Sequence, residues 1–298
     1  MRALSIAAML ALLPAGAAGV GNGHDARVEA PRDAFVGTIQ RHRVEAGETL
    51  IDLAVEYGVG YIELMAANQG VRPWVPEPGR EIVIPTAHLL PDAPREGIVV
   101  NVAELRLYWF GDDGEIETYP IGLGAEGYET PIGPTRVTMK RENPTWYPPE
   151  SVRRDRPGLP GAVPPGPHNP LGSHALNLGW PRYVIHGTNR PFGIGRFVSR
   201  GCVRMYSADV ARLFDRVEVG TPVRVIDEAV KVGWSAGNLY VEVHPDREQM
   251  AEIAVMDGSF TPNPAADVEA LVAAAAGDAS DECKVEVRTA SGSPVGVV

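Results

Sequence analysis

Short apolar runs separated by glycine and proline fill the middle of this chain. The runs at 98–101, 105–110 and 116–121 each span only four to six residues before a turn-forming residue interrupts them. Runs of this length, rich in β-branched and aromatic residues, are typical of strands rather than helices. Further strands are expected at 136–140, 175–178, 183–185 and 223–226. The sequence therefore predicts a mainly β fold, a sandwich or barrel, for residues 97–227.

A smaller unit precedes this region, at residues 40–86. Leu50, Leu53, Ala54 and Tyr57 recur at the spacing of one helix face, and Gly58 ends that helix. A second helix is expected at 61–68, and short strands are expected near 43–44 and 82–84. The order β-α-α-β fits either a ligand-binding module or a generic α+β module without a ligand.

The two ends of the chain differ from its middle. Arg2, the apolar run at 3–13 and the small residues at 15–18 have the order of a secretory signal peptide, residues 1–18, cleaved after Ala17 or Ala18. A buried N-terminal helix is the alternative interpretation of the same run. Residues 228–298 are expected to form a C-terminal α+β appendage, with strands near 239–243 and 284–288 and helices near 247–256 and 266–276.

Acidic residues outnumber basic ones by 38 to 27, which gives a net charge of −11. An acidic protein does not attract the phosphates of nucleic acids or an anionic membrane surface. No second long apolar run is present, so no transmembrane segment is expected. Charge and hydropathy therefore indicate partners other than nucleic acid and membrane lipid.

Residues 143–172 form a proline-rich segment that contains Trp146 and Tyr147. Because proline lacks an N–H group and fixes φ, this segment is predicted to contain neither a regular helix nor an interior strand. Long segments of this kind in compact domains often carry function, so we predict a lid or wall of a binding site. A solvated loop is the alternative.

One histidine and one cysteine indicate the chemistry. His186 lies sixteen positions before Cys202, and the residues between them are mostly glycine, small polar and turn-forming types. This is the pattern of two strands whose connecting loop brings a base and a nucleophile together. A thiol attacks a carbonyl group as thiolate, and imidazole accepts its proton near neutral pH. Gly187 follows the histidine directly, so its backbone carbonyl is expected to orient the imidazole.

The residues around the cysteine suggest an anionic substrate. Gly201 is expected to let a substrate approach closely, and backbone N–H groups near Gly201 and Cys202 are expected to form an oxyanion hole. Arg204 suits a carboxylate, because a guanidinium binds it with two parallel hydrogen bonds. Arg190 and Arg200 add local positive charge to an otherwise acidic chain.

The stretch H-G-T-N-x(9)-S-x-G-C-V-R-M at 186–205 resembles the signature of the L,D-transpeptidases with the YkuD catalytic fold. The likeness extends to G-I-V-V-N-V-A-E-L-R-L-Y at 97–108, Y-P-I-G-L-G at 119–124, E-T-P at 129–131 and V-P-P-G-P-H-N-P-L-G at 163–172. Residues 40–86, with G-E-T-L, A-A-N and I-V-I-P, resemble the LysM domain, which binds the N-acetylglucosamine-containing glycan of peptidoglycan or chitin. The whole chain is similar to LysM-bearing periplasmic members from Gram-negative bacteria.

The resemblance implies a β-sandwich enzyme of the periplasm that acts on peptidoglycan. Cys202 is then the nucleophile, His186 the base and Gly187 the carbonyl that orients it. The thiol attacks diaminopimelate at position three of a tetrapeptide stem, D-Ala leaves, and a thioester forms. The positions implied for substrate binding are Arg204, Ser199, Gly201, Arg200 and Asn189. The family often has histidine where Arg200 stands, so no second histidine assists here.

The amine that resolves the thioester stays open. It is either the side chain of a second diaminopimelate, which gives a 3-3 cross-link, or the C-terminal lysine of an outer-membrane lipoprotein. Likeness to the periplasmic subgroup favours the lipoprotein. The resemblance implies no metal and no cofactor.

Other interpretations of the same residues exist. In papain-like cell-wall peptidases the cysteine precedes the histidine, which is the reverse of the order here, and the histidines of this chain show no HExxH spacing for a metallopeptidase. A disulfide between Cys202 and Cys283 is the alternative in an oxidising compartment. That pairing would make the chain a non-catalytic peptidoglycan-binding wall protein.

Overall fold

The computed structural model describes residues 34–235, 238–255, 274 and 295–297, all within one compact unit, Pro31–Val298. Residues 1–18, Cys283 and the strand expected at 284–288 lie outside the described residues, as does all but residue 274 of the helix expected at 266–276. In the described ranges, no helix has the length and apolar character needed to cross a membrane.

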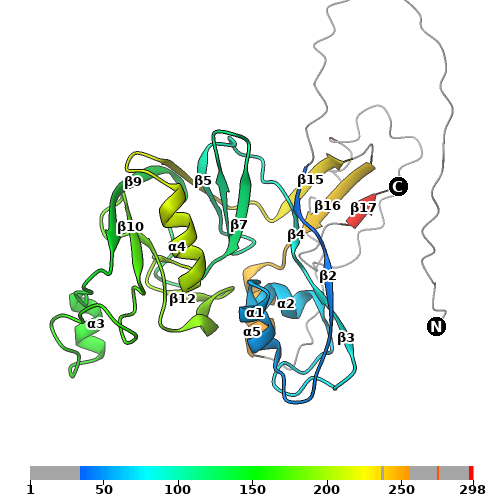
Figure 1. Ribbon diagram of the computed structural model, residues 1–298, viewed down its shortest axis with the longest axis horizontal. Helices are drawn as coiled ribbons and strands as arrows, with labels where there is room; N and C mark the ends of the chain where they lie inside the picture. Colours follow the sequence, from blue (N-terminus) through cyan, green and yellow to red (C-terminus); the bar gives the residue numbers. More distant parts are fainter. Residues whose placement is uncertain (1–33, 236–237, 256–273, 275–294, 298) are drawn as a thin grey trace, which may run out of the picture. The chain divides into compact units, whose positions relative to one another are not determined.

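Eight strands form one mixed sheet in the order β13-β11-β10-β9-β14-β5-β6-β7, of which Figure 1 labels β10, β9, β5 and β7. Neighbouring strands are antiparallel, except that β14 runs parallel to β5 and β13 runs parallel to β11. The mainly β fold is confirmed. The strands are β5 (Gly97–Asn101), β6 (Arg106–Phe110), β7 (Ile116–Pro120), β9 (Gly133–Glu142), β10 (His174–Leu178), β11 (Val184–His186), β13 (Val203–Arg204) and β14 (Pro222–Ile226).

Strand β9 joins the two halves of this sheet. Its first residues, up to Arg136, pair with β14, and its remainder, from Val137, pairs with β10. The register shifts between Asn177 and Leu178, which pair with Met139 and Val137, so Thr138 of β9 is left unpaired at the place where the pairing changes. Strands of both halves then bury side chains in one core, as in a sandwich. Its members include Ile98, Val100, Leu107, Val137, Leu176 and Ile185.

Helix α4 (Ser207–Arg216) packs against β10 and buries Val210 and Leu213 (Figure 1). Tyr206 is the N-cap residue of this helix, with no side-chain capping hydrogen bond, and Ser207 is the first helical residue. The Ser207 hydroxyl instead donates to the Thr188 carbonyl oxygen at 3.2 Å. This hydrogen bond ties the start of α4 to the loop that follows His186.

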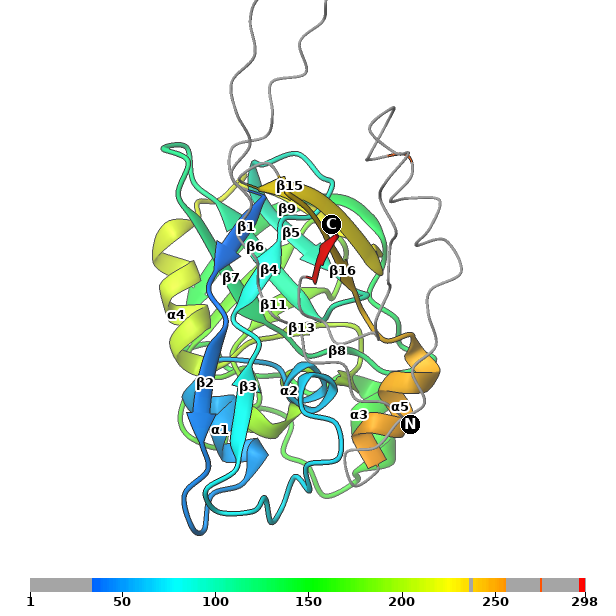
Figure 2. The same cartoon turned by 90° about the vertical axis from the view of Figure 1, so that its right-hand side faces the viewer.

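The expected β-α-α-β unit consists of β2 (Gln40–Arg43), α1 (Leu50–Glu56), α2 (Tyr61–Ala67) and β3 (Glu81–Ile84), with β2 and β3 side by side (Figure 2). Thr49 caps α1, since its Oγ1 accepts from the Asp52 N–H at 3.1 Å. Asn68 follows α2, and its side chain exchanges two hydrogen bonds with the Val83 backbone, at 2.7 and 2.8 Å. The asparagine of the A-A-N motif therefore fastens α2 to β3.

The proline-rich segment contains a short helix, α3 (Glu150–Asp155). The prediction that this segment has no regular helix is wrong, because residues 150–156 contain no proline. Pro149 is the N-cap residue, and a missing N–H group costs little at a helix start, where that group has no intrahelical partner. Trp146 and Val163 also pair through their backbones at 2.9 and 2.8 Å, which closes the segment into a loop.

The remaining elements complete the unit. The sequence did not reveal β1, β4 or β15, whereas the strand expected at 239–243 and the helix expected at 247–256 correspond to β16 and α5. Helix α5 packs against α2, and β15 and β16 pack against β4. These elements are β1 (Phe35–Gly37) paired with β4 (Ala87–Leu89), β8 (Leu123–Gly124) paired with β12 (Phe197–Ser199), the sheet of β15 (Val230–Ser235), β16 (Asn238–Val243) and β17 (Val295–Val297), η1 (Pro191–Gly193) and α5 (Arg247–Val255).

A buried ammonium group joins residues 230–243 to the main sheet. Lys231 is 1% exposed, and its Nζ lies 2.6 Å from Glu104 Oε2 and 2.9 Å from Glu242 Oε1. It also donates to the Leu89 carbonyl oxygen at 2.8 Å and to the Tyr108 hydroxyl at 2.9 Å. Because these groups come from three different parts of the chain, at residues 89, 104–108 and 242, the single cation holds them together.

Replacement of this cation tests its role. We expect Lys231→Met to lower the free energy of unfolding by about 3–5 kcal/mol, because two carboxylates stay buried without a positive partner. Urea titration followed by circular dichroism measures the change.

The matched control is Arg41→Met, which removes an ion pair of 2.7 Å to Glu81 in which both side chains are more than half exposed. An exposed pair contributes about 0–1 kcal/mol. Equal losses in the two variants would contradict the role assigned to Lys231.

Candidate active site

His186 and Arg204 lie side by side on adjacent parallel strands. His186 ends β11, Arg204 ends β13, and the two residues are paired in register. The Met205 N–H group extends this pairing by donating to the His186 carbonyl oxygen at 2.9 Å. Cys202 directly precedes β13. The strand pairing therefore sets the cysteine beside the strand that carries the histidine.

The imidazole of His186 is buried and held in one tautomer. Its Nδ1 lies 2.5 Å from the Gly187 carbonyl oxygen. A carbonyl only accepts hydrogen bonds, so Nδ1 carries the proton and Nε2 is left to accept one. Burial lowers the pKa of His186 to about 4, and the positive charges of Arg204 and Arg141 lower it further. The hydrogen bond to Gly187 acts in the opposite direction and raises this pKa. The histidine is thus a neutral base near pH 7.

Cys202 is a half-buried free cysteine. Its Sγ donates to the Arg182 carbonyl oxygen at 3.4 Å. Arg182 has a φ of +75°, a left-handed conformation that non-glycine residues rarely adopt and that is often found at functional sites. Burial raises the pKa of the Cys202 thiol, and the Arg204 charge opposes that rise. At rest the site therefore holds a neutral thiol beside a neutral imidazole.

Two hydroxyl groups hold the loop before the thiol. Ser199 is buried, its Oγ donates to the Cys202 carbonyl oxygen at 2.6 Å, and it accepts from the Gly201 N–H at 3.1 Å. Thr130 Oγ1 donates to the Gly201 carbonyl oxygen at 3.0 Å. Ser199 thus holds the loop from one side, and Thr130 holds it from the other. The sequence did not single out Thr130, although this residue lies in the E-T-P motif.

Position 201 has no room for a side chain, and the close approach of a substrate to Gly201 stays a prediction. The φ of Gly201 is +96°, and a Cβ atom there would lie 2.7 Å from Cε1 of Tyr183. The tyrosine ring fills the space, so both the backbone conformation and the packing require glycine. Two N–H groups were expected to serve as oxyanion donors, and that of Gly201 already donates to Ser199. The Cys202 N–H has no hydrogen-bond acceptor within the described residues, so it is the donor left for an oxyanion.

Arg200 and Asn189 hold the proline-rich segment. Arg200 forms an ion pair with Asp155 of α3, and its guanidinium lies 4.9 Å from the centre of the Tyr128 ring. Asn189 Nδ2 donates to the His168 carbonyl oxygen at 3.0 Å. The charge of Arg200 is therefore already balanced by a carboxylate of the same chain, in an ion pair at the protein surface.

Arg204 differs from Arg200 in having no carboxylate partner among the described residues. It is half-buried, and within the described residues no carboxylate forms an ion pair with it. Burial lowers its pKa, and the positive charge of Arg190 acts in the same direction. An anion that binds next to Cys202 would thus find an unpaired guanidinium.

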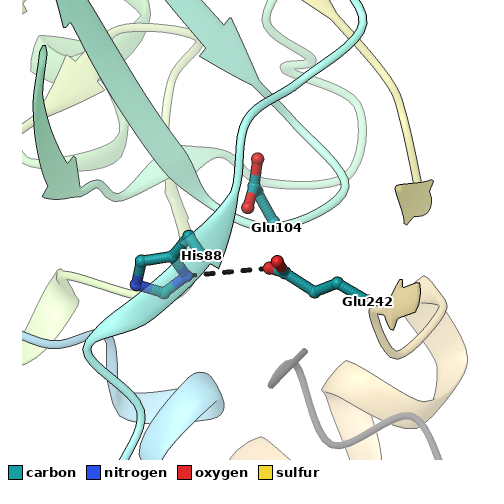
Figure 3. A group of neighbouring side chains, drawn as sticks. All are labelled: His88, Glu104 and Glu242. Carbon is teal, nitrogen blue, oxygen red and sulfur yellow. Dashed lines mark ion pairs between the residues drawn. The ribbon is translucent and has the colours of Figure 1, made fainter. Parts of the chain in front are cut away.

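His88, Glu104 and Glu242 have the composition of a metal site (Figure 3). All three are buried, their candidate ligand atoms lie within 4.8 Å of one another, and Figure 3 shows Glu242 directed at His88. The ammonium of Lys231, however, lies 2.6 and 2.9 Å from the two carboxylates, where a metal ion would have to bind. The cation that these carboxylates hold is therefore Lys231, and the cluster is structural.

Comparisons with known proteins agree with this geometry. The family model of the L,D-transpeptidase catalytic domain, YkuD, matches residues 95–225, and that of the LysM domain matches residues 42–85. YcfS of Escherichia coli K12, described as a probable L,D-transpeptidase, is 40% identical over 279 residues, which cover 87% of each chain.

Two further Escherichia coli K12 proteins carry the same description. ErfK/SrfK is 43% identical over 70% of this chain and 69% of its own length. YbiS is 43% identical over 70% of this chain and 71% of its own length. With catalytic and LysM domains matched and relatives of this identity along most of its length, the chain belongs to the L,D-transpeptidase family.

Proposed function

We propose that this enzyme is a cysteine-dependent L,D-transpeptidase that acts on the tetrapeptide stems of peptidoglycan. One observation carries the proposal, the pairing of β11 with β13. It pairs His186, whose Nε2 is left to accept a proton, with Arg204, which has no carboxylate partner among the described residues, and the free thiol of Cys202 stands two residues before Arg204 in the chain. A base, a nucleophile and a carboxylate-binding group are what acyl transfer on an anionic peptide needs.

Acylation then follows from the roles of two side chains. His186 Nε2 takes the thiol proton while Cys202 Sγ attacks the carbonyl carbon of diaminopimelate at position three of the stem. The oxyanion that forms accepts a hydrogen bond from the Cys202 N–H. As the C–N bond to D-Ala breaks, the imidazolium returns its proton to the leaving amine. The products are free D-Ala and a thioester on Cys202.

An amine resolves the thioester. Its nitrogen attacks the thioester carbonyl, the C–S bond breaks, and the proton lost by the amine passes through His186 back to the thiol. The acceptor is the lysine of an outer-membrane lipoprotein or the side chain of a second diaminopimelate. The resemblance to the LysM-bearing periplasmic subgroup of the family favours the lysine.

Two further parts of the chain support a cell-wall substrate. Arg204 would bind a stem carboxylate, and the LysM domain would bind the glycan strand, so the substrate is held at two points and its effective concentration at the thiol rises. Export to the periplasm fits the basic, apolar and small-residue order of residues 1–18.

The first test removes the nucleophile. Incubated with a disaccharide-tetrapeptide, the unaltered protein should release D-Ala and gain an acyl adduct by intact-mass spectrometry. Cys202→Ala should give neither, a loss of at least about a thousandfold, because alanine lacks the sulfur atom that attacks the stem carbonyl.

Cys283→Ala is the matched control, since it removes the other cysteine and should keep both products. An adduct that persists in Cys202→Ala, or that disappears in Cys283→Ala, would overturn the assignment of the nucleophile. D-Ala release by a protein that never forms a thioester would indicate a non-covalent route instead.

The pH dependence tests the base. Because burial holds the pKa of His186 at about 4, the imidazole stays unprotonated in mild acid. We expect kcat/KM for D-Ala release to change less than about twofold between pH 7 and pH 5.5, whereas a histidine of ordinary pKa would lose about eightfold. A fall centred near pH 6.5, in protein whose circular dichroism is unchanged, would contradict a buried neutral base.

Competition between acceptors decides the product. The acylated enzyme is offered equal concentrations of a lipoprotein C-terminal peptide that ends in lysine and of a second tetrapeptide stem. We expect the peptide adduct to predominate, and mass spectrometry of the products measures the ratio. A predominance of cross-linked stems would assign the 3-3 reaction, and release of free tripeptide alone would make the protein a cysteine peptidase.

A further inference from the structure

Thr130 contacts the nucleophile loop although it lies far from it in sequence. It follows β8, is 6% exposed, and its Oγ1 donates to the Gly201 carbonyl oxygen at 3.0 Å. The same oxygen lies 3.4 Å from the Gly124 backbone nitrogen, which donates to it. A hydroxyl group has one proton to donate, so the donor of Thr130 is committed to Gly201.

This hydrogen bond sets the direction of the next N–H group. The Gly201 carbonyl and the Cys202 N–H belong to one planar peptide, and no described peptide bond is cis. In a trans peptide the two groups point in opposite directions. When Thr130 holds the carbonyl, the Cys202 N–H must therefore point away from Thr130.

The peptide group that follows Gly201 needs such a hydrogen bond, because glycine does not fix its own backbone conformation. Gly201 has a φ of +96°, and glycine reaches other conformations at little cost, so its peptide group could turn over if nothing held it. Ser199 holds the opposite side of the cysteine, where its Oγ donates to the Cys202 carbonyl oxygen at 2.6 Å. Together the two hydroxyl groups fix the peptide on each side of the Cys202 α-carbon.

We propose that Thr130 is a positioning residue that keeps the Cys202 N–H directed at the oxyanion formed during acyl transfer. This inference rests on the proposed function, since an oxyanion forms only if Cys202 attacks a carbonyl group. Thr130 itself does not touch the reacting atoms. Its effect belongs to the transition state, so it changes kcat rather than KM.

The experiment compares two reactions of the same thiol in the full chain carrying Cys283→Ala. Acylation by a disaccharide-tetrapeptide develops an oxyanion, whereas alkylation by iodoacetamide does not. Thr130→Val keeps the shape of the side chain and removes the hydroxyl group. We expect it to lower kcat for D-Ala release about 10- to 100-fold, with KM and the alkylation rate within about twofold of the unsubstituted chain.

Two variants serve as controls. Thr130→Ser restores the hydroxyl group and should recover kcat to within about threefold. Thr138→Val removes a hydroxyl group from β9 that donates to the Asn177 carbonyl oxygen at 3.1 Å and makes no hydrogen bond to residues 199–202, and should leave both reactions unchanged.

The outcomes separate the possible failures. If Thr130→Val slows acylation and alkylation equally, the thiol itself has moved and the oxyanion role is wrong. If kcat stays within twofold, the hydroxyl group has no role in catalysis. If the unsubstituted chain releases no D-Ala, the proposed function fails, and the role of Thr130 fails with it.

Discussion

The site depends on the pairing between two very short parallel strands. Strand β13 has two residues, and its hydrogen bonds to β11 place His186 beside Arg204. On its other side, Arg204 exchanges backbone hydrogen bonds with Gly122 at 2.8 and 2.9 Å. Because side chains alternate along a strand, a slip of one residue would turn Arg204 to the opposite face and displace Cys202 from the histidine. The pairing on both edges of β13 prevents that slip.

Backbone groups hold most of this site. The Gly187 carbonyl orients His186, and the Arg182 carbonyl accepts from the thiol. Buried carboxylates would have to be desolvated, whereas backbone carbonyls bring no net charge into the interior. The arrangement needs close backbone approach, and at Gly187 a Cβ atom would lie 3.1 Å from the Val210 side chain and 3.3 Å from Gly172. A side chain at position 187 would therefore have to push these neighbours back by a few tenths of an ångström.

Sequence reasoning succeeded where the signal is local. Strand runs between turn residues, the helix spacing at 50–57 and the histidine-to-cysteine distance are all visible within a few tens of residues. It failed where the partner is distant. Strand β1 exists only because it pairs with β4, more than fifty residues later, and Thr130 reaches Gly201 across 71 positions. Lys231 has the sequence context of a surface lysine, and only the fold buries it between two carboxylates.

The position of Arg204 decides what it contributes to the reaction. Its charge lowers the pKa of both Cys202 and His186. The lower pKa of Cys202 stabilises the thiolate and so favours proton transfer from thiol to imidazole. The lower pKa of His186 destabilises the imidazolium and so opposes the same transfer. Since the two effects act in opposite directions, Arg204 gives little net drive to the transfer. Its unpaired guanidinium is instead suited to bind a substrate carboxylate, and burial together with the backbone carbonyls sets the protonation of the pair.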